Sequence, residues 1–199
     1  MTTKELEYAI NKHYLESSKI ITTNITKNSG IVSHECDVIV VTKSYYLLEF
    51  ELKISKADLK KDFQKKHSHE CDNIKKTFYV IPEELKDCIE LIPERFGIII
   101  VNKKTKIDRS GKIPLEKTYY PLRFIREAQT NKKSQKITID NFIKICGLAS
   151  MRYWTAKENE LKRDNLIVWQ KAKICDNCNN RYSVICRSCD KFSNWEDKE

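Results

Sequence analysis

Hydrophobic and polar residues follow helical or strand periodicity through the first hundred positions of the chain. The N-terminal segment has a helical apolar face, preceded by Thr2 and Glu5 at capping-box spacing. A second capping-box spacing, Ser55 with Asp58, predicts a helix that continues to about residue 67. A short helix is expected at 82–91, since Pro82 suits a first helical position. Alternating or β-branched runs predict strands at 19–26, 36–41, 45–54, 76–81 and 96–102.

This order of elements predicts an α/β fold. It reads helix, three strands, helix, strand, short helix, strand, so an antiparallel meander should precede crossover connections. We expect a core domain at 1–105 and a connection with a helical extension at 106–168. Within that extension, 138–163 has a helical pattern, and the segment around 103–117 is interpreted as a polar connection. Residues 169–199 are expected to form a separate C-terminal module.

Charge narrows the choice of partner. The 199-residue chain has a net charge of +9 and a pI near 9.0. A basic balance favours polyanions, with nucleic acid first and an anionic membrane second. No apolar run approaches the ~20 residues of a membrane span, and the N-terminus lacks the pattern of a signal peptide. We therefore expect an intracellular protein, cytoplasmic or, in a eukaryote, nuclear, whose eight cysteines are reduced or metal-bound.

The stretch YYLLEFELKIS, residues 45–55, carries unusual charges for a strand. If it forms a hairpin with residues 35–42 about residue 44, Asp37 lies opposite Glu51 and Glu35 lies opposite Lys53. Like charges in direct opposition destabilise an antiparallel pair. A hard divalent cation such as Mg²⁺ would neutralise them, since it binds carboxylate oxygens and phosphate. The alternative is an exposed strand face, with Glu51 and Lys53 as a weak surface ion pair.

The residues of this hairpin resemble a known nuclease motif. Asp37 followed by Glu51-Leu52-Lys53 is similar to the PD-(D/E)XK nuclease superfamily. ELKISKADLKKDFQKKH, then KKTFYVIPEEL and LIPERFGIIIV, resembles the MmcB-like branch of DNA-repair endonucleases. The resemblance covers about residues 3–102 and implies a restriction-endonuclease-like core, αβββαβ, with a mixed sheet flanked by helices.

The resemblance also implies roles for these residues. Asp37 and Glu51 would hold Mg²⁺ or Mn²⁺, and Lys53 would orient or activate the attacking water or stabilise the phosphate. Many members of the superfamily add a glutamate from the first helix. Glu5 and Glu7 are the candidates for that position, and Glu7 is favoured.

Two positions depart from the motif. Cys36 precedes Asp37 where the superfamily name has proline, and Glu49 lies on the same strand face as Glu51 and could compete as a ligand. On the following helix, Gln64 and Lys65 occupy positions where the superfamily often has an auxiliary polar residue.

The segment 53–66 holds six lysines against two aspartates. It is either a solvated helix face or an edge that contacts phosphates, in which case its binding weakens steeply with salt. The residues predicted to contact nucleic acid are Lys56, Lys60, Gln64 and Lys65. His67 and His69 are interpreted as polar surface, and His34 as a possible phosphate contact.

Four cysteines near the C-terminus have metal-site spacing. Cys175 and Cys178 form one C-x₂-C pair, Cys186 and Cys189 form another, and seven residues separate the pairs. Two such pairs supply the thiolates of a closed, structural Cys₄ zinc site. Disulfides or a redox pair are the alternatives. The scattered Cys36, Cys71, Cys88 and Cys146 are interpreted as small buried hydrophobes.

Three functions are consistent with these patterns. The first is a Mg²⁺-dependent nuclease, acting on DNA, that carries a zinc module. The second is a non-cleaving nucleic-acid-binding or assembly protein on the same fold. The third is a zinc-module adaptor whose α/β domain holds no metal. The sequence leaves open DNA against RNA, endonuclease against exonuclease action, and the oligomeric state.

Overall fold

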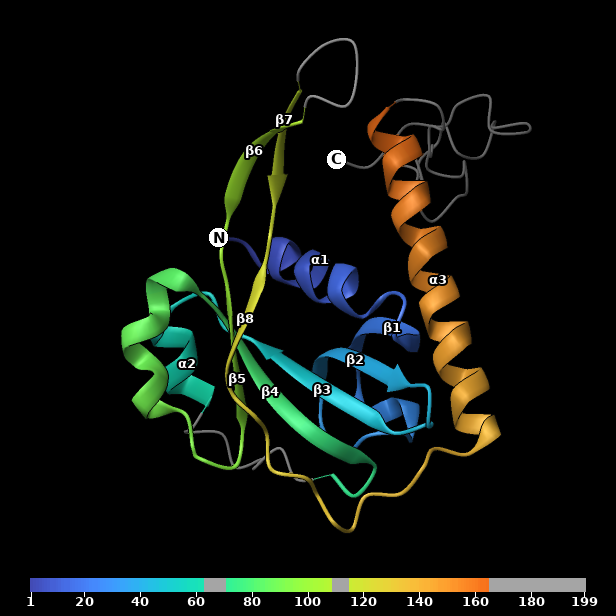
Figure 1. Ribbon diagram of the computed structural model, residues 1–199. Helices are drawn as coiled ribbons and strands as arrows, with labels where there is room; N and C mark the ends of the chain where they lie inside the picture. Colours follow the sequence, from blue (N-terminus) through green and yellow to red (C-terminus); the bar gives the residue numbers. More distant parts are fainter. Residues whose placement is uncertain (63–70, 109–114, 165–199) are drawn as a thin grey trace, which may run out of the picture. The chain divides into compact units, whose positions relative to one another are not determined.

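The computed structural model describes residues 1–62, 71–108 and 115–164 (Figure 1). The elements η1 and η2 are 3₁₀ helices. In chain order the elements are α1 (Thr3–Tyr14), β1 (Ser18–Ile25), η1 (Lys27–Ser29), β2 (Cys36–Thr42), β3 (Leu47–Leu52), α2 (Lys56–Asp62), β4 (Ile74–Pro82), η2 (Glu83–Leu91), β5 (Gly97–Val101), β6 (Lys104–Asp108), β7 (Leu115–Tyr119), β8 (Leu122–Arg126) and α3 (Ile139–Arg163).

Six strands form one mixed sheet in the order β1-β2-β3-β4-β5-β8. The strands β1, β2 and β3 are antiparallel neighbours, β3, β4 and β5 are parallel, and β8 returns antiparallel to β5. The two parallel steps are crossovers that carry α2 and η2. The expected α/β class, with an antiparallel meander before the crossovers, is confirmed.

Helices cover both faces of the sheet. Leu6, Ala9 and Ile10 of α1 pack on one face, against a core that includes Phe50 and Val80. On the other face, α2 and η2 cover the residues near the ends of β4 and β5. The first part of α3, through Ile145, covers the residues of β2 and the beginning of β3. With a buried face on each side, β5 and the second part of β4, from Phe78, are apolar, as central parallel strands are.

Helix ends follow the predicted capping signals. The side chain of Thr2 accepts a hydrogen bond from the backbone N–H of Glu5, and the Glu5 carboxylate accepts one from the backbone N–H of Thr2. At the start of α2, the Ser55 hydroxyl accepts from the backbone N–H of Asp58. The short helix expected at 82–91 has 3₁₀ geometry instead.

The sheet continues past the expected domain boundary at residue 105. The segment interpreted as a polar connection contains β6 and the start of β7, and β8 adds the edge strand beside β5. The chain divides into two compact units, Met1–Met151 and Arg152–Glu199. The expected C-terminal module at 169–199 lies outside the described residues. Among the helices that the structure describes, none has both the length and the apolar character needed to cross a membrane.

Candidate metal-dependent active site

The hairpin of β2 and β3 has the register assumed from the sequence. Val38 pairs with Phe50 and Ile39 pairs with Glu49, so one further step along the same register brings Asp37 opposite Glu51. The backbone N–H of Leu52 donates to Asp37 Oδ2 at 2.8 Å. Asp37 is therefore held beside the Glu51-x-Lys53 segment, as the hairpin register assumed from the sequence required.

Lys53 lies at the centre of a buried ionic network. Its Nζ is 3.0 Å from Glu51 Oε2 and 3.1 Å from Asp62 Oδ1. The second oxygen of Asp62 accepts a hydrogen bond of 2.6 Å from the Tyr79 hydroxyl. The exposed fractions are 3% for Glu51, 4% for Lys53 and 2% for Asp62. The alternative of an exposed strand face, with a weak surface pair between Glu51 and Lys53, is therefore wrong.

The network keeps the Lys53 side chain protonated. Burial alone lowers the pKa of a lysine, but the carboxylates of Glu51 and Asp62 outweigh burial, so the pKa of Lys53 is raised above its ordinary value. An ammonium with a raised pKa is a poor general base near neutral pH. Lys53 can instead act as a fixed positive charge and hydrogen-bond donor.

Glu7 is the candidate from α1 that was favoured in the sequence. Partial burial raises the pKa of its carboxyl, and the negative charge of Asp37 raises it further, while Lys4 opposes both effects. The charge of Asp37 therefore acts on Glu7, the residue favoured as the contribution of the first helix.

Glu5, the other candidate from α1, is engaged elsewhere. Its Oε1 accepts hydrogen bonds of 2.8 Å from Lys103 Nζ and from the Tyr120 hydroxyl. Lys103 is the largest cause, and Thr2 and Tyr120 are further causes, of a pKa lowered to about 2 for the Glu5 carboxyl. Glu5 therefore caps α1 and binds Lys103 and Tyr120. These hydrogen bonds stabilise the negative charge of its carboxylate.

Glu49 faces the same side as Glu51 but has its own partners. One carboxylate oxygen lies 2.5 Å from Nε2 of His34, and the other accepts a 2.8 Å bond from the Thr77 hydroxyl. Potential metal-ligand atoms of His34, Cys36 and Glu49 all lie within 4.8 Å of one another, and this donor set suits zinc. Burial, and then Glu49, raise the pKa of Cys36, so its sulfur is a protonated thiol. The carboxylate of Glu49 is thus held by hydrogen bonds to His34 and Thr77.

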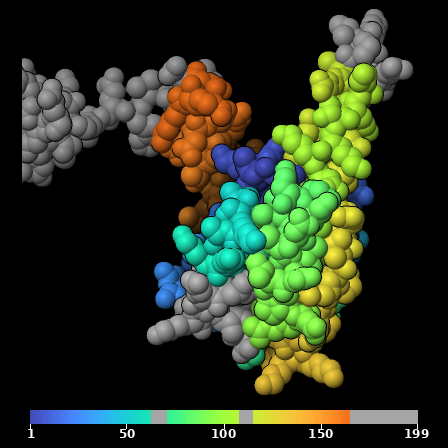
Figure 2. Space-filling view, turned by 90° about the vertical axis from the view of Figure 1, so that its left-hand side faces the viewer, coloured from blue at the N-terminus to red at the C-terminus, as the bar shows by residue number. Residues whose placement is uncertain are grey.

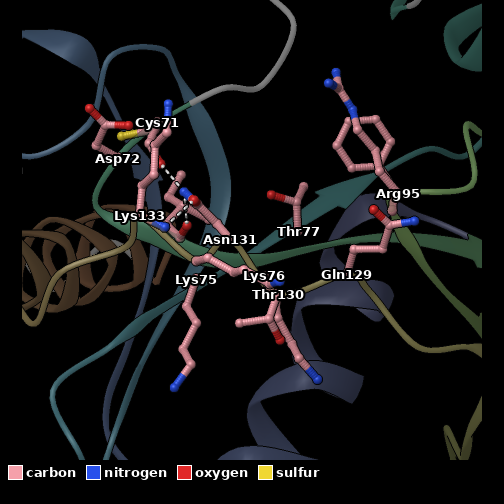
Figure 3. A pocket seen from close by; sticks show the side chains of 13 residues that line it. Cys71, Asp72, Lys75, Lys76, Thr77, Arg95, Gln129, Thr130, Asn131 and Lys133 are labelled. Atoms are coloured by element: carbon pink, nitrogen blue, oxygen red, sulfur yellow. Dashed lines mark hydrogen bonds between the residues drawn. The ribbon is translucent and has the colours of Figure 1, made fainter.

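A pocket of about 420 Å³ opens near the start of β4 (Figure 3). Its wall includes Thr77, which connects the pocket to buried Glu49. Asn131 donates through its amide to the backbone oxygens of Cys71 and Ile74, and these bonds tie the segment after β8 to β4. Five basic side chains line the pocket: Lys75, Lys76, Arg95, Lys132 and Lys133.

Two of the four predicted nucleic-acid contacts lie in the described part of the chain. Lys56 and Lys60 are exposed on α2, whereas Leu59 and Asp62 of the same helix point inward. Figure 2 shows α2 (cyan) beside η2 (green). The predicted residues Gln64 and Lys65, the histidines at 67 and 69, and the zinc ligands Cys175, Cys178, Cys186 and Cys189 lie outside the described residues.

Sequence reasoning assigned no role to Asp62 or Tyr79. Asp62 is three residues after Leu59, at helical spacing that places both on the buried face of α2. Tyr79 pairs with Glu51 across the parallel step from β3 to β4. The helical periodicity of α2 could have predicted that Asp62 is buried. The position of Tyr79 beside Glu51 depends on the register between β3 and β4, which a crossover joins.

Comparisons with known proteins bear on the fold alone. Neither the family models nor the curated proteins gave a match. Among solved structures, the chain is similar to a protein of unknown function from Silicibacter pomeroyi, with a TM-score of 0.51 and 17% identity. The similarity covers 85% of this chain and 96% of that one. It supports the mixed α/β architecture.

Proposed function

We propose that the chain is a Mg²⁺-dependent nuclease that hydrolyses phosphodiester bonds in DNA, with a restriction-endonuclease-like core. The observation that carries the proposal is the hydrogen bond from Leu52 N–H to Asp37, within a register that sets Asp37 against Glu51. Because Lys53 follows two residues later and contacts Glu51, the three residues that resemble the PD-(D/E)XK motif lie together where β2 begins and β3 ends.

The donor atoms suit a hard divalent cation. Asp37 and Glu51 would hold Mg²⁺ or Mn²⁺, and Glu7 would complete the set from α1, all through carboxylate oxygens. Partial burial first, and then the negative charge of Asp37, raise the pKa of the Glu7 carboxyl, and a bound cation would oppose both effects. A bound Mg²⁺ supplies positive charge to the phosphate oxygens and lowers the pKa of a water bound to it.

Lys53 would act on the substrate through its charge. Its ammonium stays protonated because Glu51 and Asp62 flank it, so it can donate hydrogen bonds to a phosphate oxygen or orient the attacking water. Asp62 is a positioning residue in this scheme, since it touches Lys53 and is itself held by the hydroxyl of Tyr79. Removal of Asp62 should therefore affect cleavage through Lys53.

The alternative is a nucleic-acid-binding or assembly protein that does not cleave. The burial of Lys53, at 4% exposure, favours this second candidate. A closed ionic network of that kind can also be purely structural. The two candidates share a partner and differ in whether phosphodiester bonds break.

A plasmid-nicking assay with Mg²⁺ separates these candidates. Asp37→Asn and Lys53→Met should each reduce the nicking rate by about 100-fold or more, the scale for loss of one electrostatic group from an active site. Glu127→Gln and Lys76→Met are matched controls, because these two side chains form an ion pair outside the site. Equal nicking by all variants would indicate a contaminating nuclease. No nicking by the wild-type protein on any DNA or RNA would favour the binding protein.

A further inference from the structure

The β6–β7 ribbon, residues 104–108 and 115–119, extends from one edge of the main sheet. Val101 of β5 pairs with Leu122 of β8, and three residues further along the same register Lys104 pairs with Tyr119. The ribbon is thus the distal part of one long hairpin, interrupted at Pro121, which has no N–H for the ladder. In Figure 1 the ribbon projects away from the six-stranded sheet.

One face of the ribbon concentrates lysines. Partners across the ribbon share a face, so Lys104, Lys106, Lys117 and Tyr119 lie together. Lys106 is directly opposite Lys117, a pairing that destabilises an antiparallel ribbon. The ammonium of Lys106 lies 5.6 Å from the centroid of the Tyr119 ring. An unfavourable pair on an exposed ribbon points to a polyanionic partner for this lysine face.

The opposite face is chemically different. Thr105 pairs with Thr118, and Ile107 pairs with Glu116. The side chains of both faces are exposed at positions 104–107 and 115–119. Since neither face packs on a core, the lysines of the ribbon are not required for folding of the sheet.

The base of the ribbon is tied to the helix that carries Glu7. Lys103 and Tyr120 flank the ribbon at its base, and both donate to Glu5 of α1. The ring of Tyr120 also meets Tyr8 edge-on at 6.0 Å. In Figure 2 the ribbon (yellow-green) rises beside α1 (dark blue). A polymer that contacts the ribbon can therefore reach the candidate active site.

We propose that the lysine face of the β6–β7 ribbon binds duplex DNA. This inference rests on the proposed function, which supplies DNA as the partner. It adds that the β6–β7 ribbon holds the DNA and that the ribbon prefers double-stranded to single-stranded DNA. The major groove of B-DNA is about 12 Å wide and admits a two-stranded ribbon. Lys104, Lys106 and Lys117 are then available to contact phosphates on the groove walls, and the Tyr119 ring lies beside the ammonium of Lys106.

Fluorescence anisotropy with a labelled duplex tests the proposal in the full chain without added divalent ions. At about 0.1 M salt, counterion release is worth up to ~8-fold in affinity for each phosphate contact, so Lys106→Ala/Lys117→Ala should weaken binding ~8- to 60-fold. The slope of log affinity against log salt should become shallower by about 2. Lys132→Ala/Lys133→Ala removes the same charge from the pocket near β4 and should leave both quantities almost unchanged.

The outcomes separate this inference from the nuclease assignment, because binding is measured without cleavage. Equal losses in the two double variants, or no loss in either, would overturn the ribbon proposal. A loss for the labelled single strand as large as that for the duplex would overturn the preference for two strands. If the ribbon variant alone loses duplex affinity, the proposal stands even where the wild-type protein nicks no plasmid. Neither variant should have a lower melting temperature than the wild-type protein, since these lysines are exposed and the Lys106–Lys117 pair is itself unfavourable.

Discussion

Replacement of Lys53 by methionine should destabilise the fold more than replacement of Asp62 by asparagine. Lys53→Met removes the ammonium that contacts both Glu51 and Asp62 and leaves two buried carboxylates close together. Asp62→Asn removes one charge, retains an oxygen acceptor for the Tyr79 hydroxyl, and leaves Glu51 and Lys53 as a neutral pair. The order of the two effects therefore follows from the charges in the network.

The magnitudes follow from burial. Loss of one partner from a buried ion pair costs about 3–5 kcal/mol, so Lys53→Met should lower the melting temperature by about 6–20 °C for a chain of this length. Asp62→Asn weakens charge-assisted hydrogen bonds and should cost about 1.5–3 kcal/mol. Lys76→Met, in the exposed pair with Glu127, should change stability by less than about 1 kcal/mol.

The pH dependence gives the same experiment a second readout. In the wild-type protein the pKa of Lys53 is raised, so its contribution is complete below the unfolded-state pKa near 10.5 and is lost as pH rises above it. In Lys53→Met the pKa of a remaining carboxyl should rise above about 4, so the folded state binds extra protons and stability falls with increasing pH. Circular-dichroism melts should show a larger deficit at about pH 8 than at about pH 5. A smaller cost for Lys53→Met than for Asp62→Asn would refute this account.

Three further predictions concern packing, titration and zinc. Gly97→Ala would drive a methyl group into the neighbouring aromatic ring of β4 and should cost about 1–3 kcal/mol in urea unfolding. Gly147→Ala, in open space within α3, should instead stabilise by up to about 1 kcal/mol. The Glu5 carboxyl should titrate by NMR near its pKa of about 2, so its stabilising effect is present above the ordinary pKa of about 4.3 and lost as pH falls toward 2. Cys186→Ser should abolish one equivalent of bound zinc by elemental analysis, whereas Cys88→Ser, at a buried cysteine outside the motif, should not.

The candidate site could be predicted where neighbours in sequence are neighbours in space. The hairpin of β2 and β3 has a four-residue connection between Thr42 and Leu47, and period-two patterning with a short turn fixes its register. Asp37 and Glu51 could therefore be paired from the sequence. The helix caps of α1 and α2 could also be predicted, because each involves residues only three positions apart.

Features that depend on distant pairings could not be predicted. Asp62 meets Tyr79 through a crossover from β3 to β4, and no local pattern sets that register. The strand β8 was missed because Pro121 interrupts the hairpin that continues from β5 through β6 and β7. Polar residues on both faces made the segment around β6 and β7 look like a connection, since a ribbon that packs on no core lacks the apolar alternation of a half-buried strand.

Glu51, near the end of β3, belongs both to the ionic network of Lys53 and to the proposed metal site. The ammonium of Lys53 meets Glu51 and Asp62, and the charge of Asp37 acts on the carboxyl of Glu7. Burial of a carboxylate costs free energy unless a positive charge compensates it. The raised pKa of Glu7 is one sign of that cost. The proposed divalent cation, held by Glu7, Asp37 and Glu51, would offset this cost, and Asp62 would hold Lys53 in position.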